Sequence, residues 1–271
     1  IFKISYEDQN EIGSGSFGTT VFKGKFDDRR VAVKRVLKKH AQLVGREVDA
    51  LKESDTHDNV LRYFYKSTLN EETITRISNS STWDEEAVPV QDPAIPLTSQ
   101  EILRHATEGV KYLHSNKKVH RDLKPQNIMF STRGGTVRAV ISDFGLCKQL
   151  AENKSKFTRP TALSGTEGWM PPEALKMEST SYPMDIFALG LIYYYVLSGG
   201  HHPFGDQYNQ TYNIMRGEYL LDKLEAPESK RLIALTLSPD QSQRPTATDI
   251  LLDPFMWDVQ KRVDFLCQVC D

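Results

Sequence analysis

The sequence predicts an α+β fold in which a small β-rich lobe is followed by a larger, mostly helical lobe. Up to residue 77, short runs alternate apolar and polar residues between glycines, a pattern typical of a twisted antiparallel sheet. After Thr98, a candidate helix N-cap followed by Glu101, apolar residues recur at helical spacing. The segment 78–96 between these parts combines a Ser/Asn cluster with acids and three prolines, so we interpret it as a linker.

Composition and charge exclude several classes of protein. The 271 residues are 39% hydrophobic and 26% charged, which is the composition of a folded globular protein. The net charge of -2 provides no global field for gripping a nucleic-acid backbone, so nucleic acid is not an expected partner. The longest apolar run, Ile186 to Leu197, is too short for the ~20 residues that cross a bilayer and predicts a buried helix. No membrane segment is therefore expected in this chain. The chain begins at Ile1 without a signal sequence, and we expect it to be part of a longer protein.

Cysteine usage indicates a reducing compartment. The three cysteines, Cys147, Cys267 and Cys270, are too few to form a disulfide scaffold. Cys267 and Cys270 make a C-x-x-C pattern, but no second pair completes a zinc site. We therefore predict a half-buried helix face at this position.

The first candidate site is the run Gly13 to Gly18, which reads G-S-G-S-F-G between two strand-like segments. This pattern alone is weak, because dinucleotide sites and ordinary turns also contain it. In a dinucleotide site a helix follows the glycines, whereas Thr19 to Phe22 is β-branched and aromatic. We therefore expect a hairpin whose glycines fold over phosphate groups.

Two charged residues further along support phosphate binding. Lys34 ends a predicted strand, 31–33, where its ammonium has apolar neighbours and can reach phosphate oxygens. Glu47 lies in a helix predicted at 45–52 and is placed to pair with that lysine. Taken singly, each would be an ordinary surface residue.

The decisive stretch is H-R-D-L-K-P-Q-N at 120–127, followed by D-F-G at 143–145. Phosphoryl transfer needs a carboxylate that accepts the proton of the attacking hydroxyl, and oxygen ligands that hold magnesium on the phosphates. Asp122 suits the first task, and Asn127 and Asp143 suit the second. Lys124 is placed to offset the charge that develops on the transferred group.

In this order, these motifs resemble the signature of protein kinases across nearly the whole chain. The resemblance implies a bilobal protein kinase fold with an N-lobe at 1–77, a linker at 78–96 and a C-lobe at 97–271. It implies ATP and Mg²⁺ as cofactors. The ATP-binding residues that it implies are Ile12, Gly13, Gly15, Ser16, Gly18, Val21, Ala32, Lys34, Glu47 and Met129.

The second half of the chain carries further landmarks of this family. Residues 165–173 resemble the end of an activation segment, Asp185 resembles the buried helix aspartate, and Arg244 resembles the usual partner of Glu173. Lys124 and Thr166 resemble the serine/threonine subclass, which implies serine or threonine as the acceptor.

A closer resemblance is to the inositol-requiring kinase/endoribonucleases, the unfolded-protein sensors of the endoplasmic reticulum. It rests on residues 141–148, the Gly-Thr-Glu-Gly-Trp run at 165–169, residues 202–205 and residues 254–257. It implies a kinase on the cytosolic face of that membrane, with a ribonuclease beginning where this chain ends, so no residue here is expected to cut RNA. It also implies a homodimer that phosphorylates its own kind in trans. The acceptor candidates are Thr158, Thr161 and Ser164, and Arg121 is placed to pair with a phosphate added there.

The sequence departs from the kinase pattern at two places. Pro171-Pro172-Glu173 replaces Ala-Pro-Glu, a change that we expect to be tolerated. A short strand, 73–77, is followed by a polar, proline-broken stretch where a kinase has its hinge, so either 78–80 forms a minimal hinge or a deletion weakens the adenine pocket. The second possibility keeps open a pseudokinase or scaffold that docks a partner. A metabolic small-molecule kinase is disfavoured, because such enzymes rarely carry this activation segment.

Overall fold

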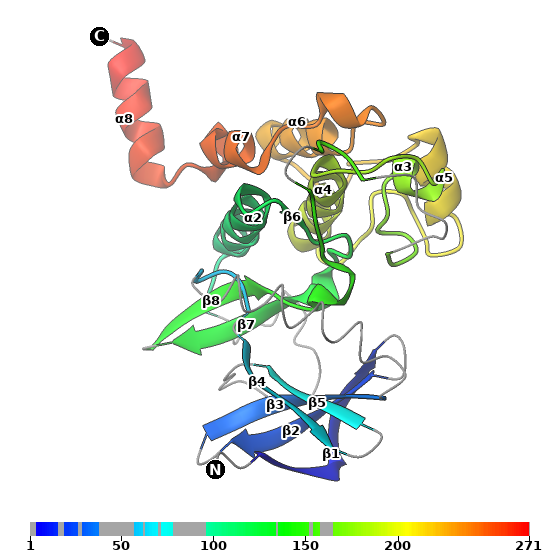
Figure 1. The fold of residues 1–271 in the computed structure, drawn as a ribbon. Helices are drawn as coiled ribbons and strands as arrows, with labels where there is room; N and C mark the ends of the chain where they lie inside the picture. Colours follow the sequence, from blue (N-terminus) through cyan, green and yellow to red (C-terminus); the bar gives the residue numbers. More distant parts are fainter. Residues whose placement is uncertain are drawn as a thin grey trace.

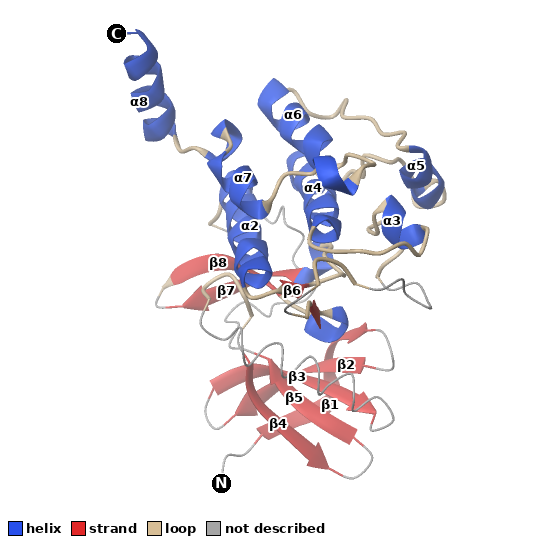
Figure 2. Ribbon diagram, turned by 45° about the horizontal axis from the view of Figure 1, so that its top comes forward, coloured by secondary structure: helices blue, strands red, loops and turns tan. Residues whose placement is uncertain are grey.

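The computed structural model describes residues 4–15, 19–26, 29–37, 57–61, 63–69, 72–77, 96–133, 135–151, 154–157 and 165–270. Figure 1 shows strands gathered in one lobe that contains the N-terminus and helices gathered in a second lobe, and Figure 2 shows the same division from another side. The predicted α+β fold with two lobes is therefore confirmed. The helix predicted at 45–52 and most of the predicted linker, 78–95, lie outside the described residues.

The smaller lobe is built on one antiparallel sheet with the strand order β1-β2-β3-β5-β4. Phe22 on β2 pairs with Val33 on β3, and both side chains are buried. The predicted Gly-rich hairpin joins β1 to β2, with Gly15 paired to Thr19 next to the turn. The strands of this sheet are β1 (Ile4–Gly15), β2 (Thr19–Phe26), β3 (Arg29–Leu37), β4 (Tyr63–Leu69) and β5 (Glu72–Ile77).

The position of Lys34 in the sheet corrects one expectation. Lys34 does not end its strand, because β3 continues to Leu37. The continuation is stabilised by pairing with β5, which extends as far as Leu37 opposite Glu72. Lys34 therefore lies inside the sheet, between Val21 on β2 and Thr75 on β5. A central strand holds the base of this long side chain more firmly than a strand end would.

The core of the larger lobe is formed by two long helices, α2 (Ser99–Ser115) and α4 (Pro183–Leu197). The apolar run at 186–197 forms the buried helix that its sequence predicts, although α4 begins earlier, at Pro183. Gly190 allows α4 to approach α6 closely, since a Cβ there would clash with the Thr236 hydroxyl. The other helices are α3 (Pro172–Leu175), α5 (Gln210–Arg216), α6 (Pro227–Thr236), α7 (Ala247–Leu252) and α8 (Val259–Cys270).

The N-terminus of α2 has the predicted cap. The Thr98 hydroxyl accepts a hydrogen bond from the Glu101 N–H at 3.2 Å, and the Glu101 carboxylate accepts one from the Thr98 N–H at 2.7 Å. The Thr98 N–H and the Thr98 hydroxyl both donate hydrogen bonds to the Glu101 carboxylate, which lowers the pKa of Glu101. Such a reciprocal cap contributes about 1 kcal/mol and fixes where the second lobe's first helix begins.

Short elements between α2 and α3 carry the candidate site. Two pairs of antiparallel strands, β6 with β9 and β7 with β8, lie against α2 and hold the intervening loops. These elements are β6 (Lys118–Val119), β7 (Ile128–Arg133), β8 (Thr136–Ile141), β9 (Lys148–Gln149) and the 3₁₀ turns η3 (Pro125–Asn127) and η4 (Phe144–Leu146). Two further 3₁₀ turns, η5 (Gln241–Gln243) and η6 (Pro254–Met256), flank α7.

The C-terminal helix α8 extends away from the rest of the larger lobe in both Figure 1 and Figure 2. It contains the C-x-x-C pattern, but Cys267 and the other described side chains of this helix are exposed, so the half-buried helix face predicted here is wrong. No cluster of metal-ligating side chains occurs among the described residues. Within the same residues, no helix has the length and apolar character that crossing a membrane requires.

Candidate active site

The loop at 120–122 is held by a buried carboxylate from α4. Asp185 is 1% exposed, and its two oxygens accept hydrogen bonds from the backbone N–H groups of His120 at 2.8 Å and Arg121 at 2.9 Å. His114 Nε2 donates a third bond at 2.9 Å. Burial alone favours the protonated carboxyl, but the bond from His114 and the neighbouring positive charge lower the pKa of Asp185. Asp185 therefore fixes the loop as a charged anchor.

Asp122, Lys124 and Thr166 form a compact cluster. Thr166 Oγ1 donates to Asp122 Oδ1 at 2.6 Å, while Lys124 Nζ donates to Asp122 Oδ2 at 3.1 Å and to Thr166 Oγ1 at 2.7 Å. Asp122 is 9% exposed, so these bonds form largely away from water. The cluster joins the loop after β6 to the segment before α3. Its arrangement places a carboxylate that accepts a hydrogen bond from a hydroxyl beside a cation, the combination that transfer to an alcohol requires.

Asn127 lies beneath this cluster and supports the same loop. Its Nδ2 donates to the backbone carbonyl of Asp122 at 2.7 Å, and its side chain is buried. The His120 ring donates through Nε2 to the Ser142 carbonyl at 2.9 Å, which links the loop to the strand that ends before Asp143. Two candidate oxygen ligands for magnesium, from Asn127 and Asp143, are thus supplied by neighbouring segments of one framework.

Asp143 occupies a constrained backbone position between β8 and η4. Its φ of 57° is in the left-handed region, which is costly for a residue with a side chain. The next residue, Phe144, is completely buried and packs its ring edge-on against His120 with centroids 5.1 Å apart. Packing of Phe144 offsets the strain at Asp143 and directs its carboxylate toward the smaller lobe.

Lys34 and Asp143 connect the two lobes. Lys34 Nζ donates to Asp143 Oδ1 at 3.1 Å, and Lys34 is 8% exposed. Burial raises the pKa of Asp143, but the charge and hydrogen bond of Lys34 outweigh it, so the pKa lies below its ordinary value. An ionised carboxylate and a buried ammonium are therefore present where phosphate oxygens and a divalent cation would need them. The Asp143 carboxylate and the Asn127 amide oxygen suit Mg²⁺, and the Lys34 ammonium suits the phosphates of a nucleoside triphosphate.

The remaining candidate ATP-binding residues are only partly described. Gly13 and Gly15 lie on β1, and Val21 lies half-buried on β2 directly across from Lys34. Met129 lies half-buried on β7, the strand that follows Asn127. Ile12 and Ala32 are placed by their backbone alone, on β1 and β3. Three ATP-binding candidates, Ser16, Gly18 and Glu47, lie outside the described residues. The phosphorylation candidates Thr158, Thr161 and Ser164 lie outside them as well.

The structure brings Glu173 and Arg244 together in a buried ion pair. The guanidinium binds both carboxylate oxygens, at 2.7 and 2.8 Å, and the side chains are 4% and 0% exposed. Arg244 also donates to the carbonyls of Ser238 and Pro183. The predicted pairing is therefore present, and it connects α3 to the start of α4 and to the segment before α7.

The double proline before Glu173 fits its place in the fold. Pro171 is the N-cap of α3 with φ of −72°, and Pro172 occupies the first helical positions, where no intrahelical donor is needed. Both prolines are buried. The departure from the Ala-Pro-Glu pattern thus leaves Glu173 correctly presented to Arg244.

Sequence reasoning named Arg121 but missed its two neighbours, Lys148 and Phe157. Arg121 Cζ and Lys148 Nζ lie over the Phe157 ring, 5.7 and 4.9 Å from its centroid. Burial lowers the pKa of Arg121, and its Nε is buried without a hydrogen-bond partner among the described residues. Lys148 reaches this position because it pairs with Val119 on β6. No sequence signal reveals the pairing of two such short strands.

Comparison with known proteins agrees with this geometry. The family model for the protein kinase domain matches residues 6–256. The chain is 41% identical to the serine/threonine-protein kinase/endoribonuclease ire-1 of Caenorhabditis elegans, over 99% of this chain and 29% of that protein. It is 39% identical to the serine/threonine-protein kinase/endoribonuclease IRE2 of Homo sapiens, over 99% of this chain and 30% of that protein.

A fungal relative has a name that describes its role. The chain is 37% identical to the sensor for unfolded proteins in the ER, ire1, of Schizosaccharomyces pombe, over 96% of this chain and 27% of that protein. The chain therefore spans less than a third of the length of these relatives. The resemblances predicted from the motifs are confirmed, and because the family match covers nearly all of the sequence, this chain belongs to the protein kinase domain family.

Proposed function

We propose that this chain transfers the γ-phosphoryl group of ATP to serine or threonine hydroxyls, and that a second copy of the chain is its first substrate. The observation that carries this proposal is the cluster of Asp122, Lys124 and Thr166, in which a hydroxyl donates to the candidate base at 2.6 Å. The bond from Thr166 means that Asp122 Oδ1 accepts a hydrogen bond from an aliphatic alcohol. The hydroxyl of an acceptor serine or threonine has the same chemistry.

The reaction assigns a separate task to each described side chain. The acceptor oxygen forms a bond to the γ-phosphorus while the bond from that phosphorus to the β,γ-bridging oxygen breaks, and Asp122 takes the hydroxyl proton. Lys124 offsets charge on the transferred group. Lys34 holds phosphate oxygens, exchanging part of its present contact with Asp143 for them. Asn127 and Asp143 would hold Mg²⁺, which supplies neutralisation of phosphate charge when bound.

The position of Thr166 favours transfer between copies over transfer within one chain. Thr166 already occupies the hydrogen-bonding position at Asp122 of its own chain. The acceptor candidates Thr158, Thr161 and Ser164 precede it by only a few residues, so their hydroxyls would have to displace it to reach the same carboxylate. The loop of a second copy is tethered at its own Asp122 and not at the carboxylate that it must reach, although its hydroxyl also has to displace Thr166 there. A homodimer, at least a transient one, follows from this proposal.

We propose that phosphate added to this loop is held by Arg121 and Lys148. Among the described residues, the buried Nε of Arg121 has no hydrogen-bond partner, and the Lys148 ammonium lies beside the same aromatic ring. An anion bridging these two cations would order the loop through charge-assisted hydrogen bonds. Phosphorylation would thereby stabilise the arrangement of the loop that carries Asp122.

The names of the relatives suggest the setting of the longer protein. We infer that it is a sensor of unfolded protein at the endoplasmic reticulum, with this kinase on the cytosolic side. Two of the relatives are also endoribonucleases, and we place that activity outside this chain. No group described here has a role in cutting RNA in this proposal.

The proposal is tested by ATP·Mg²⁺ titration calorimetry and by mass spectrometry of the 271-residue chain after incubation with ATP. We expect binding that Asp143→Ala abolishes, together with phosphate on Thr158, Thr161 or Ser164. Mixing active chain with an Asp122→Asn copy of different mass shows whether transfer occurs in trans. If neither binding nor phosphate is detected, the catalytic proposal fails and the scaffold alternative is favoured.

A further inference from the structure

His202 connects the loop before α5 to the segment that carries Thr166. Its Nε2 lies 3.1 Å from the backbone carbonyl oxygen of Gly168, 34 residues earlier in the chain. Its ring packs edge-on against the neighbouring Trp169, with the two ring planes at 86° and their centroids 5.2 Å apart. The run 202–205 contributes to the closer resemblance, but no task for this histidine follows from it. In the structure, one half-buried side chain contacts two consecutive residues beside the candidate active site.

The hydrogen bonds of the two ring nitrogens define the protonation state of His202. The Phe204 N–H donates to Nδ1 at 3.2 Å, so Nδ1 carries no hydrogen. A neutral imidazole then carries its hydrogen on Nε2, which donates to the Gly168 carbonyl. Burial lowers the pKa of His202 to about 4, so the ring is neutral near physiological pH. A single tautomer therefore satisfies both contacts.

The loop that carries His202 is anchored in the core of the larger lobe. Phe204 is 1% exposed, and its ring packs against Phe187 on α4 and against Tyr219, with centroids 6.0 and 5.5 Å apart. Asn213 on α5 donates from Nδ2 to the Phe204 carbonyl at 2.9 Å. His202 therefore extends from a fixed support, so its bond restrains the segment that it reaches.

The bond to Gly168 continues through a short turn to the candidate active site. Residues 166–169 form this turn, in which the Trp169 N–H donates to the Thr166 carbonyl at 3.1 Å. Thr166 begins the turn, and its hydroxyl accepts a hydrogen bond from Lys124 at 2.7 Å. The turn is thus held near one end by His202 and at the other end by the loop that carries the candidate catalytic groups.

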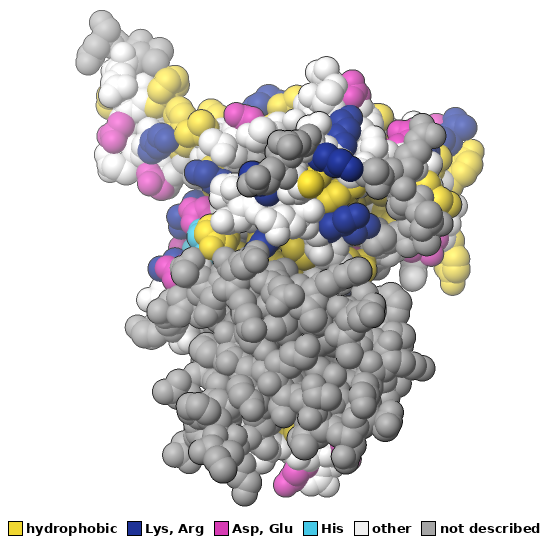
Figure 3. All heavy atoms as spheres, in the orientation of Figure 1, with side chains coloured by type: hydrophobic (Ala, Val, Ile, Leu, Met, Phe, Trp, Pro, Cys, Tyr) yellow, Lys and Arg dark blue, Asp and Glu magenta, His cyan; other side chains and the backbone are white. Residues whose placement is uncertain are grey.

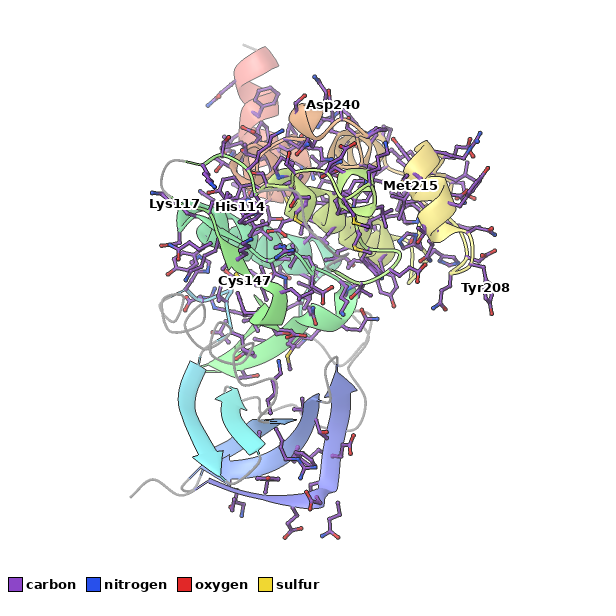
Figure 4. The ribbon with its side chains drawn as sticks, turned by 45° about the vertical axis from the view of Figure 1, so that its right-hand side comes forward. His114, Lys117, Cys147, Tyr208, Met215 and Asp240 are labelled. Carbon is purple, nitrogen blue, oxygen red and sulfur yellow. The ribbon has the colours of Figure 1, made fainter. Side chains whose placement is uncertain are left out.

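Other side chains of the same loop face solvent and provide controls. Figure 4 shows Tyr208 at the outer edge of the larger lobe, and Figure 3 shows hydrophobic side chains facing solvent at the edge where α5 lies. Tyr208 is 97% exposed, although it follows His202 by only six residues. His201 is exposed as well, and its Nδ1 lies 2.8 Å from a carbonyl of its own loop. Within the described part of the chain, neither control residue has a hydrogen bond or ring contact with the turn at 166–169.

We propose that His202 is a positioning residue, whose Nε2–H bond to Gly168 holds the turn at 166–169 against the loop that carries Lys124. Through this turn, His202 keeps the Thr166 hydroxyl where it orients the Lys124 ammonium. This inference rests on the proposed function, because the orientation of that ammonium matters to the transfer of a phosphoryl group. His202 has no part in the proposed ATP site, so we expect an effect on kcat and none on ATP affinity.

Two amide replacements separate the contact with Gly168 from the rest of the side chain. In His202→Asn an amide oxygen near the position of Nδ1 still accepts the Phe204 N–H, but the side chain is too short to reach Gly168. His202→Gln is one bond longer and places an amide N–H near the position of Nε2. We expect kcat for phosphorylation of the Asp122→Asn copy to fall about fivefold in His202→Asn and to recover to within about twofold in His202→Gln.

Controls and a double variant identify the route of the effect. His201→Asn and Tyr208→Ala are expected to leave kcat unchanged, and calorimetry should give the same ATP·Mg²⁺ affinity for every variant. If His202 acts through the Thr166 hydroxyl, adding His202→Asn to Thr166→Val should lower kcat by less than about twofold further. Urea unfolding verifies that each variant is folded. His202→Phe, which keeps a ring against Trp169 but cannot donate to Gly168, is used if His202→Asn is unfolded.

Hydrogen exchange measured by mass spectrometry tests the restraint without relying on catalysis. The Trp169 N–H is protected by its bond within the turn, so we expect it to exchange about tenfold faster in His202→Asn and at the original rate in His202→Gln. The His201→Asn control should leave this rate unchanged.

The outcomes separate this inference from the proposed function. Unchanged exchange or unchanged kcat in a folded variant that cannot reach Gly168 overturns the positioning role. A full fivefold loss in the Thr166→Val background also overturns it, because His202 would then act by another route. Failure of the unmodified chain to phosphorylate the Asp122→Asn copy overturns the proposed function, and in that case the exchange rates still decide whether His202 holds the turn.

Discussion

Replacing Arg244 by methionine removes a fully buried guanidinium that binds three parts of the larger lobe. The side chain holds both oxygens of Glu173 at 2.7 and 2.8 Å and donates to the carbonyls of Ser238 and Pro183. Methionine fills much of the volume but leaves the Glu173 carboxylate buried without its counterion. Breaking a buried pair from one side costs about 3–5 kcal/mol, which lowers the Tm of a domain of this size by about 6–20 °C.

The assay is equilibrium unfolding in urea for the single variants and for Glu173→Gln/Arg244→Met. Because the two groups share one interaction, we expect the double variant to lose less stability than the sum of the single losses, with a coupling energy of about 2 kcal/mol. Arg231→Met is the matched control, since its pair with Asp253 leaves the Arg231 side chain 52% exposed, and such a pair contributes at most about 1 kcal/mol. Additive losses, or an Arg244→Met variant no less stable than Arg231→Met, would refute the reasoning.

Two further predictions concern histidine ionisation and the hydroxyl beside Asp122. Burial lowers the pKa of His202 from its ordinary value of about 6.5 to about 4. The neutral imidazole therefore contributes fully to the free energy of unfolding above about pH 6.5, and this contribution is lost as the pH falls toward 4. Urea unfolding should show a loss of about 2 kcal/mol between pH 7 and 5, and His202→Gln should flatten the curve. Thr166→Val removes the hydroxyl that accepts a hydrogen bond from Lys124 at 2.7 Å and orients this cation, so kcat on a peptide substrate should fall about 10- to 100-fold. Thr166→Ser should restore kcat, and an unchanged kcat in the valine variant would contradict the role of this hydroxyl.

Local signals in the sequence were sufficient for the parts of the fold that depend on neighbours along the chain. The cap at Thr98 requires only two residues three positions apart, and α4 follows from an uninterrupted apolar run. The proximity of Asp122, Lys124 and Asn127 was also predictable, because one short loop carries all three. Such features are determined by spacing within a few residues, so no knowledge of tertiary contacts is needed.

The features that the sequence did not reveal depend on pairing between distant segments. Lys34 was expected at a strand end, but β5 extends the pairing beyond it. Lys148 reaches Phe157 and Arg121 only because the two-residue strands β6 and β9 meet. The Thr211 hydroxyl on α5 donates a hydrogen bond to Glu167, 44 residues earlier in the chain. Each of these contacts joins residues whose spacing in the sequence carries no periodic or motif signal.

One buried carboxylate accounts for the geometry of the loop at 120–122. Arg121 has φ of 72°, a conformation that costs about 1–3 kcal/mol for a residue with a side chain. Asp185 offsets this cost by accepting the N–H groups of both His120 and Arg121. The backbone turn that results sends the Arg121 side chain toward Phe157 and leaves Asp122 facing Thr166. The same anchor therefore orients the group proposed to bind phosphate and the group proposed to accept the proton, so a change at either position can be transmitted to the other through two adjacent peptide bonds.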